Sequence, residues 1–433
     1  MAAACGSYQA PDPHRPVTSL EVRIAPDHAM VLGRQRVLLA PDLPVTRVAF
    51  RLWANAPRVR ARGGGIRVLK ATIGGAARAD LRPGGNLSTL LSLRLPRQVP
   101  AGSRLSVDLS WRLRLPAGSA NRMGHVGSTA WFGSGAPLLA WERGVGWAVE
   151  PPTSLHGETA TSEDGRLADL AVVTDAKDAV LATGTPGLVR PLGAGRVVHH
   201  FSAASVRDVM VAAGRFRVVH RLVRGVRLRV GAAPGVPDAP AAVAGRVGAA
   251  VVAHATRFGP FPYPDLAVAM LPGMAGGIEF PGAIMLGPLA GHPATLSHEV
   301  AHEWFYGLVG NDQARDPWLD EAFATYAEAL HRNTGPSYES RTVPAAGVRR
   351  VGAPMTYWEA HPSAYYRSVY VQGAVALLRA RRAAGPARFD AALRCYVAQQ
   401  ARRVARPADL ATALAGLPAA RRVLVGYGAL PSG

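Results

Sequence analysis

Two histidines and two glutamates stand within the six residues HEVAHE at positions 298–303. Residues four apart on a helix project from the same face, so His298 and His302 could bind one metal ion together. A glutamate directly after the first histidine of such a pair is typical of zinc sites in which it acts as a general base. Glu299 is therefore the expected base. Glu303 points about 100° away from His302, and we expect it to be solvated or structural.

A catalytic zinc needs a third protein ligand and an open fourth position. Glu321 follows His302 after eighteen intervening residues, in the apolar-periodic segment PWLDEAFATYAE. This gap suits a turn and a second helix that begins near Pro317 and faces the first one. The sequence thus predicts Glu321 as the third ligand and one zinc ion per chain as the cofactor. Glu328, two turns further on the same face, either helps to orient the ligands or is an exposed charge.

The remaining elements must position these residues. From residue 17 to 217, short segments alternate apolar and polar residues between Gly, Pro, Asp and Asn, which predicts an all-β domain of sandwich type. Helical periodicity then takes over, interrupted by a predicted strand at 265–271. The expected organisation is an N-terminal tail at 1–16, an all-β domain at 17–217 and a catalytic domain at 218–433. The predicted helices span 241–259, 295–309, 317–333 and 370–385.

The formal charge of the 433-residue chain is +20, which could indicate a nucleic-acid partner. Only Lys70 and Lys177 are lysines, however, and the many arginines are scattered among Ala, Gly and Pro. This pattern is typical of a coding bias rather than of a binding stripe, so no nucleic-acid partner is expected. No apolar run reaches the roughly 18 residues of a membrane span, so no transmembrane segment is expected either.

Cys5 and Cys395 are the only cysteines. Two cysteines cannot form a disulfide framework, and their separation is not that of a metal site, so we expect structural cysteine chemistry to be minor. Ala3, Ala4 and Cys5 resemble the cleavage end of a bacterial lipoprotein signal, without the charged and apolar regions that should precede it. Two alternatives stay open: an extracytoplasmic lipoprotein anchored at Cys5, its upstream signal missing, or a cytoplasmic protein with an accidental likeness.

The HExxH motif followed after eighteen residues by Glu resembles the M1 family of zinc metallopeptidases, the gluzincin aminopeptidases. Further upstream, GGIEFPG stands where that family carries a Gly-x-Met-Glu-Asn strand. The resemblance implies that Glu279 binds the α-amino group of a substrate and that Gly276 and Gly277 bring the backbone close to it. Ile278 and Phe280 replace the family's Met and Asn, which puts the substrate-backbone contacts of that Asn in doubt.

Downstream, YYRSVYVQG resembles the family's Tyr-x-Lys-Gly segment and implies that Tyr370 stabilises the transition state, although Gln372 replaces the Lys. Tyr365 and Tyr366 are alternates. The family usually adds a second amine-binding residue from the β domain. Its counterpart cannot be placed in this chain; the acidic residues near the right region are Glu150, Glu158 and Glu163.

The resemblance covers most of the chain and implies an α+β multidomain fold, with an N-terminal all-β sandwich-like domain followed by a mainly helical, thermolysin-like zinc peptidase domain. Many family members continue into a large helical domain, so a short form without that domain is expected. The implied activity is that of an aminopeptidase acting on peptides with a free N-terminus. A zinc endopeptidase or dipeptide-releasing variant is the first alternative, and an inactive surface binding module with a structural zinc is the second.

Overall fold

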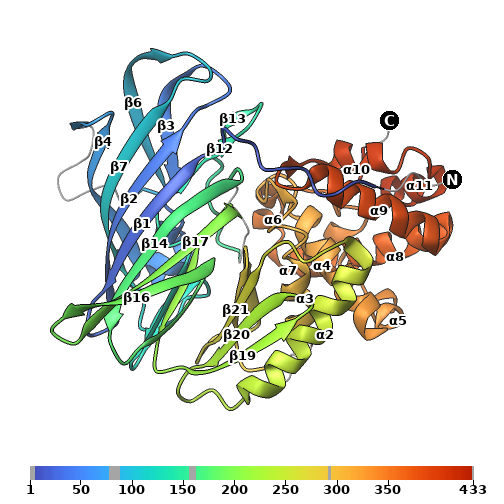
Figure 1. Cartoon of the computed structure of the whole chain (residues 1–433). Helices are drawn as coiled ribbons and strands as arrows, with labels where there is room; N and C mark the ends of the chain where they lie inside the picture. Colours follow the sequence, from blue (N-terminus) through green and yellow to red (C-terminus); the bar gives the residue numbers. More distant parts are fainter. Residues whose placement is uncertain (1–4, 78–87, 156–161, 291–293, 432–433) are drawn as a thin grey trace.

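A computed structural model places a β-rich region beside a helix-rich region (Figure 1). It describes residues 5–77, 88–155, 162–290 and 294–431. The strands from the N-terminal half of the chain, blue to green in Figure 1, lie on one side, and the helices from the C-terminal part, orange to red, lie on the other. This confirms the α+β fold, with an all-β region first and a mainly helical region after it.

An eight-stranded sheet dominates the β region, in the order β16-β17-β14-β1-β2-β7-β4-β5. Its neighbouring strands are antiparallel except β1 and β14, which are parallel. Buried and exposed residues alternate along β2, so one face of the sheet packs inward and the other faces solvent. The strands are β1 (Val17–Ile24), β2 (Met30–Leu39), β4 (Gly65–Ile73), β5 (Ala76–Ala77), β7 (Leu105–Arg114), β14 (Gly165–Asp175), β16 (Thr185–Gly193) and β17 (Arg196–Val206).

Smaller sheets cover the inner side of this region and share a core with the large sheet through buried side chains such as Phe50, Trp111 and Phe132. The five-stranded sheet comprises β8 (Gly118–Ser119), β9 (Met123–Val126), β10 (Thr129–Gly133), β15 (Ala179–Ala182) and β18 (Met210–Gly214). The others comprise β3 (Val45–Arg51), β6 (Leu90–Val99) and β11 (Leu138–Leu139), and β12 (Trp141–Glu142) with β13 (Gly146–Trp147). Between β3 and β4 lie the short helices η1 (Trp53–Asn55) and α1 (Pro57–Ala61).

A second five-stranded sheet begins the C-terminal region, in the order β19-β20-β21-β23-β22. We propose the domain boundary at residue 217, where this sheet starts. Helix α2 (Pro240–Phe258) packs against β19 and β20; it begins with a proline, whose fixed φ suits the first helical position, and ends before Gly259 at φ 109°. The strands are β19 (Arg217–Val223), β20 (Val226–Ala232), β21 (Asp265–Met270), β22 (Gly277–Phe280) and β23 (Ala283–Leu286).

The helices that follow pack into one core with this sheet. Helix α4 ends at Asn333, which adopts the left-handed conformation (φ 55°) that often terminates a helix. The elements are α3 (Thr295–Ala301), β24 (Gly310–Asn311), α4 (Trp318–Arg332), α5 (Gly335–Glu339), η2 (Ala345–Gly347), α6 (Met355–Ala360), α7 (Pro362–Tyr366), η3 (Arg367–Gln372), α8 (Gly373–Ala384), α9 (Pro386–Gln400), β25 (Val404–Ala405), α10 (Pro407–Ala413) and α11 (Pro418–Gly426).

The helix predicted at 295–309 is too long, because α3 ends at Ala301. Beyond it the chain makes wide turns, in which the N–H of Gly307 donates to the His302 carbonyl and that of Leu308 to the Glu303 carbonyl, five residues back. Trp304 and its neighbours are buried on every side. An apolar run of this kind does not distinguish a helix from a buried turn, which explains the wrong length.

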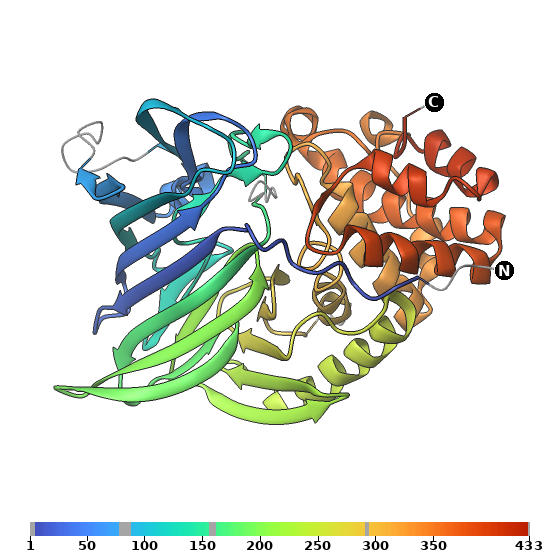
Figure 2. The same ribbon diagram turned by 45° about the horizontal axis from the view of Figure 1, so that its top comes forward.

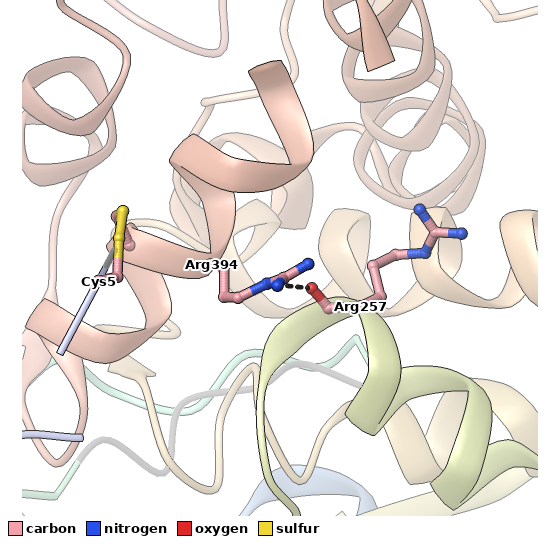
Figure 3. Close-up of a disulfide and its surroundings, with 4 residues drawn as sticks. Cys5, Arg257 and Arg394 are labelled. Carbon is pink, nitrogen blue, oxygen red and sulfur yellow. Dashed lines mark hydrogen bonds between the residues drawn. A yellow bond between two sulfur atoms is a disulfide. The ribbon is translucent and has the colours of Figure 1, made fainter. Parts of the chain in front are cut away.

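The N-terminal segment 5–16 crosses from β1 to the helical region (Figure 2). Cys5 in this segment and Cys395 in α9 form a disulfide, with their Cα atoms 5.1 Å apart (Figure 3). The hydroxyl of Tyr8 donates to the Pro260 carbonyl at 2.5 Å and accepts from the Trp304 indole at 3.2 Å. The segment is thus bound to the helical region both covalently and through hydrogen bonds.

This disulfide corrects the expectation that the cysteines have little structural role. The two residues are 390 positions apart, and no local spacing could reveal the pair. Within the part of the chain that the structure describes, no helix is both long enough and apolar enough to cross a membrane.

Candidate active site

Helices α3 and α4 bring three potential metal ligands together. His298 Nε2 lies 3.1 Å from His302 Nε2 and 3.1 Å from Glu321 Oε2, and His302 Nε2 lies 3.4 Å from the same carboxylate oxygen. A tetrahedral zinc ion with bonds of about 2.0–2.1 Å would hold its ligand atoms about 3.3 Å apart. The triangle therefore fits zinc and leaves a fourth position toward the cavity.

The other ring nitrogens of both histidines have hydrogen-bond acceptors. His302 Nδ1 donates to the Phe305 carbonyl at 3.0 Å, which is available because the chain turns after α3. His298 Nδ1 lies 3.4 Å from Thr325 Oγ1, and that hydroxyl donates to the Glu321 carbonyl at 2.8 Å. These acceptors favour the tautomer in which Nδ1 of each ring carries the proton. The Nε2 lone pairs are then available for a metal.

Buried carboxylates make this site electronegative. Burial alone would lower the pKa of His302, but Glu279 and Glu321 outweigh burial and raise it well above its ordinary value. Burial would raise the pKa of Glu321, but His302 and His298 outweigh it and lower that pKa. The cluster therefore favours a positive charge among its donor atoms, which a metal cation supplies.

Glu299 lies on α3 beside this cluster, is 4% exposed, and lines the cavity. Its carboxylate, that of Glu279 and a His302 ring nitrogen offer ligand atoms that all lie within 4.8 Å of one another. A Cβ on Gly277 would lie 2.4 Å from the Glu299 side chain, so only glycine allows β22 to approach so closely. Gly276 adopts φ 76°, which also favours glycine.

Glu279 lies on β22, the edge strand of the second sheet, and is 4% exposed. Its Oε1 has no hydrogen-bond partner among the described residues, although it lines the cavity. Phe280 does not line the cavity. Its ring fills the space where a Cβ on Gly133 would lie, and the Arg122 guanidinium stacks 5.5 Å from its centre. The residue that replaces the family's Asn is therefore used in packing.

Tyr370 lies in η3, a stretch of wide helical turns of the kind often found at functional sites. Its ring stacks on the His298 ring with centroids 5.8 Å apart. Tyr365 and Tyr366 also line the cavity and contact the Tyr370 ring at 5.7 and 5.1 Å. Gln372 instead donates to the Gly347 carbonyl at 2.7 Å, a structural contact.

Two further glutamates near the metal cluster are buried. Glu303, 1% exposed, accepts the N–H of Gly282 at 2.8 Å and so ties the end of α3 to the turn between β22 and β23; burial raises its pKa. It is not solvated, and the structural alternative remains. Glu328 is 3% exposed rather than an exposed charge. It accepts the Tyr338 hydroxyl at 2.7 Å and lies 3.8 Å from His298 Nδ1.

The cavity above these residues has a volume of about 810 Å³ and is lined by both regions of the molecule. Glu150 and Glu163, considered as second amine-binding residues, are not among the described residues that line it. Glu150 pairs with Arg51 at 3.0 Å, and Glu163 accepts the Arg143 N–H at 2.8 Å. Glu158 lies outside the described residues. The β region contributes Arg58, Ala61, Arg62, Ser119, Ala120 and Asn121.

Thr325, Tyr338 and Arg341 also line the cavity and were not predicted from the sequence. Thr325 had a signal, because it stands four residues after Glu321 on the same helix face. Tyr338 and Arg341 follow the end of α4, and no sequence pattern indicated that they would reach the cavity.

Comparisons with known proteins relate the chain to zinc peptidases. Residues 292–423 match the model of the peptidase family M1 domain. A segment of 43 residues is 51% identical to aminopeptidase N of Streptomyces lividans, which is 10% of this chain but only 5% of that protein.

Similar solved structures cover nearly the whole chain. The M1 zinc metallopeptidase from Deinococcus radiodurans matches with a TM-score of 0.74 at 20% identity, over 97% of this chain and 95% of its own. A variant of it bound to Tyr-Ser-Ala matches with a TM-score of 0.73 at 19% identity. The match covers 96% of this chain and 94% of that one. A two-domain M1 zinc metallopeptidase variant bound to L-arginine matches with a TM-score of 0.72 at 20% identity. The match covers 98% of this chain and 96% of that one.

The family model covers the segment that contains both histidines and Glu321, and the solved structures share the arrangement of β region and helical region. Residues 292–423 thus match the peptidase family M1 domain, and the chain shares its fold over nearly its whole length with M1 zinc metallopeptidases.

Proposed function

We propose that this protein is a zinc aminopeptidase that removes N-terminal residues from peptides. One observation carries the proposal: the buried Glu279 carboxylate, whose Oε1 has no partner among the described residues, faces the cavity beside the His298, His302 and Glu321 cluster. A buried charge without a partner is costly. The α-ammonium group of a peptide would supply that partner and would place the first peptide bond near the cluster.

His298, His302 and Glu321 would hold the zinc ion. A zinc ion in this position supplies a Lewis acid for the scissile carbonyl and lowers the pKa of water. Glu299, next to His298 on α3, is placed to accept a proton from the attacking water and to pass it to the leaving amine. Tyr370, stacked on His298, would donate a hydrogen bond from its hydroxyl to the carbonyl oxygen as negative charge develops there.

The alternatives differ in which of these residues they need. An endopeptidase would bind its substrate without the Glu279 contact and would cleave peptides with a blocked N-terminus. An inactive binding module would need only a structural zinc, which usually has four protein ligands. The three-ligand triangle, with Glu299 beside it, favours a catalytic site over a structural one.

The test compares free and N-acetylated forms of one peptide, with zinc content measured on the same preparation. We expect about one zinc per chain, cleavage of the free peptide, and little cleavage of the acetylated one. Glu279→Gln should lower kcat/KM for the free peptide by about 10- to 100-fold, because a charge-assisted hydrogen bond is lost. Glu21→Gln, on β1 of the eight-stranded sheet, is the matched control and should leave the rate unchanged.

Equal cleavage of both peptides by the native protein would replace the aminopeptidase proposal with the endopeptidase one. A folded protein that binds no zinc and cleaves neither peptide would remove both.

A further inference from the structure

Acidic and basic side chains both line the cavity. The acidic side chains are Glu279, Glu299, Glu321 and Glu328, and they lie in and beside the metal cluster. Among the described residues outside the cluster, the basic side chains that line the cavity are Arg58, Arg62 and Arg341. A cavity with both signs of charge suits a ligand with both an ammonium group and a carboxylate.

A series of contacts leads from the metal cluster to Arg341 without passing through Glu279. Glu279 lies near His302 and Glu299. The series begins at His298, whose Nδ1 lies 3.8 Å from Glu328, and continues through the Tyr338 hydroxyl, which donates to Glu328 at 2.7 Å.

The series ends at the arginine, whose guanidinium carbon lies 4.4 Å from the centre of the Tyr338 ring. A peptide whose ammonium group binds Glu279 would therefore extend past the metal cluster toward Arg341. An extended chain covers about 3.3–3.6 Å per residue. Two residues beyond the cleaved bond would therefore extend the substrate by about 7 Å along the part of the cavity that Tyr338 and Arg341 line.

Arg341 has no carboxylate within ion-pair distance among the described residues, unlike its neighbours in the structure. Arg332 pairs with Glu328 at 3.5 Å, and Arg382 pairs with Glu339 at 2.5 Å. Arg341 is half-buried, and its stacking on Tyr338 restricts the guanidinium group. A planar, pre-positioned guanidinium without a counter-ion is suited to bind a carboxylate through two hydrogen bonds.

We propose that Arg341 binds a carboxylate about two residues beyond the cleaved bond, which makes the site selective for tripeptides with a free C-terminus and for peptides with an acidic side chain at the third position. This inference rests on the proposed aminopeptidase function. It adds a second anchor, so that Glu279 and Arg341 together select short peptides by both ends.

The test measures kcat/KM for three short substrates: Leu-Gly-Gly, its C-terminal amide and the C-terminal amide of Leu-Gly-Glu. A hexapeptide that begins with Leu-Gly is measured as well, once with a free C-terminal carboxylate and once as the amide. We expect Leu-Gly-Gly to exceed its amide by about tenfold or more, as for a hydrogen bond to a charged group. The Leu-Gly-Glu amide should recover this advantage, because its side chain supplies the carboxylate. The hexapeptide acid and amide should be cleaved equally, because their C-termini lie beyond Arg341.

Arg341→Gln should lower the rate for Leu-Gly-Gly to that of its amide and leave leucine p-nitroanilide, which has no carboxylate, unaffected. Arg62→Gln removes a charge from the same cavity but from the β region, and it should preserve the preference. Equal rates for acid and amide in the native protein would overturn the inference. An equal loss in Arg62→Gln and Arg341→Gln would also overturn it, because general electrostatics would then explain the effect.

Calorimetric titration of the Glu299→Gln variant separates this inference from the proposed function. The variant should bind Leu-Gly-Gly more tightly than its amide, and adding Arg341→Gln should abolish that difference. Absence of hydrolysis in the native protein with a retained binding preference would contradict the aminopeptidase function alone. Equal binding of acid and amide would contradict the role of Arg341 alone.

Discussion

The metal cluster and the surrounding substrate wall are built in different ways. Of the three candidate ligands, His298 lies in the last turn of α3, His302 directly follows that helix, and Glu321 comes from the next helix along the chain. The wall, defined here by Glu279, Tyr370 and the residues after α4, combines an edge strand, a stretch of wide turns and a loop. The cluster depends mainly on local spacing, whereas the wall depends on how distant segments pack.

This difference has a physical cause. Metal coordination requires ligand atoms about 3–3.5 Å apart, and a helix supplies this separation through residues four positions apart. A peptide is longer than a metal ion, so its binding groups must be spread over a distance that one helix turn cannot span. The predictions below test whether the two parts are also functionally separate.

The largest expected effect on kcat concerns Glu299, which lies between the metal cluster and the substrate wall. Glu299→Gln should lower kcat by about 10²–10⁴-fold, because general-base catalysis is lost, and should leave the zinc content unchanged. Metal analysis and steady-state kinetics on the same sample measure both. Glu303→Gln is the matched control, since its amide oxygen can still accept the Gly282 N–H. Loss of zinc in Glu299→Gln would assign this residue to the metal cluster and break the distinction.

The next effect concerns the wall alone. Tyr370→Phe should lower kcat by about 10²–10³-fold, the range for removal of one donor to a developing oxyanion, with little change in KM or zinc content. Tyr366→Phe, which removes a hydroxyl from the neighbouring ring, should have a much smaller effect. A larger loss in Tyr366→Phe, measured with the same substrate, would transfer the role to Tyr366.

The smallest effect concerns the support beneath α3. His254 of α2 is buried, and its Nε2 donates to the Ser297 carbonyl at 3.0 Å, directly before the first ligand. Burial lowers the pKa of His254 to about 3, from an ordinary value of 6.5. The unfolded chain therefore binds a proton below pH 6.5 that the folded protein does not bind until about pH 3. The resulting stability is complete above pH 6.5 and decreases as the pH falls toward 3.

Between pH 7 and pH 5 this histidine should reduce the free energy of unfolding by about 2 kcal/mol. Urea unfolding of the native protein and of His254→Gln at both pH values measures the contribution, because the variant lacks the titrating group. Identical pH dependence in the two proteins would show that His254 is not held neutral beneath the metal helix.

Local patterns predicted the elements better than their ends. The strands around β1, β7 and β14 followed from period-two alternation, and α2 followed from its apolar spacing. The end of α3 did not, because Trp304 and the residues after it are apolar for burial rather than for helix formation. Helix geometry left Glu303 as either solvated or structural, and the structure favours the second alternative, because the chain leaves the helix at that point and buries this side chain against Gly282.

The sequence by itself determined which residues are candidates for chemistry: two histidines and a glutamate at helical spacing, a third carboxylate on the next helix, and a glutamate two residues after a pair of glycines. These follow from helix and strand periodicity, which are properties of the local chain. Only the tertiary structure decided where the strand with Glu279 meets α3, which tyrosine stacks on His298, that Arg341 faces the cavity, and that Cys5 meets Cys395. Those contacts join residues far apart in sequence, and packing of the whole core fixes them rather than any local preference.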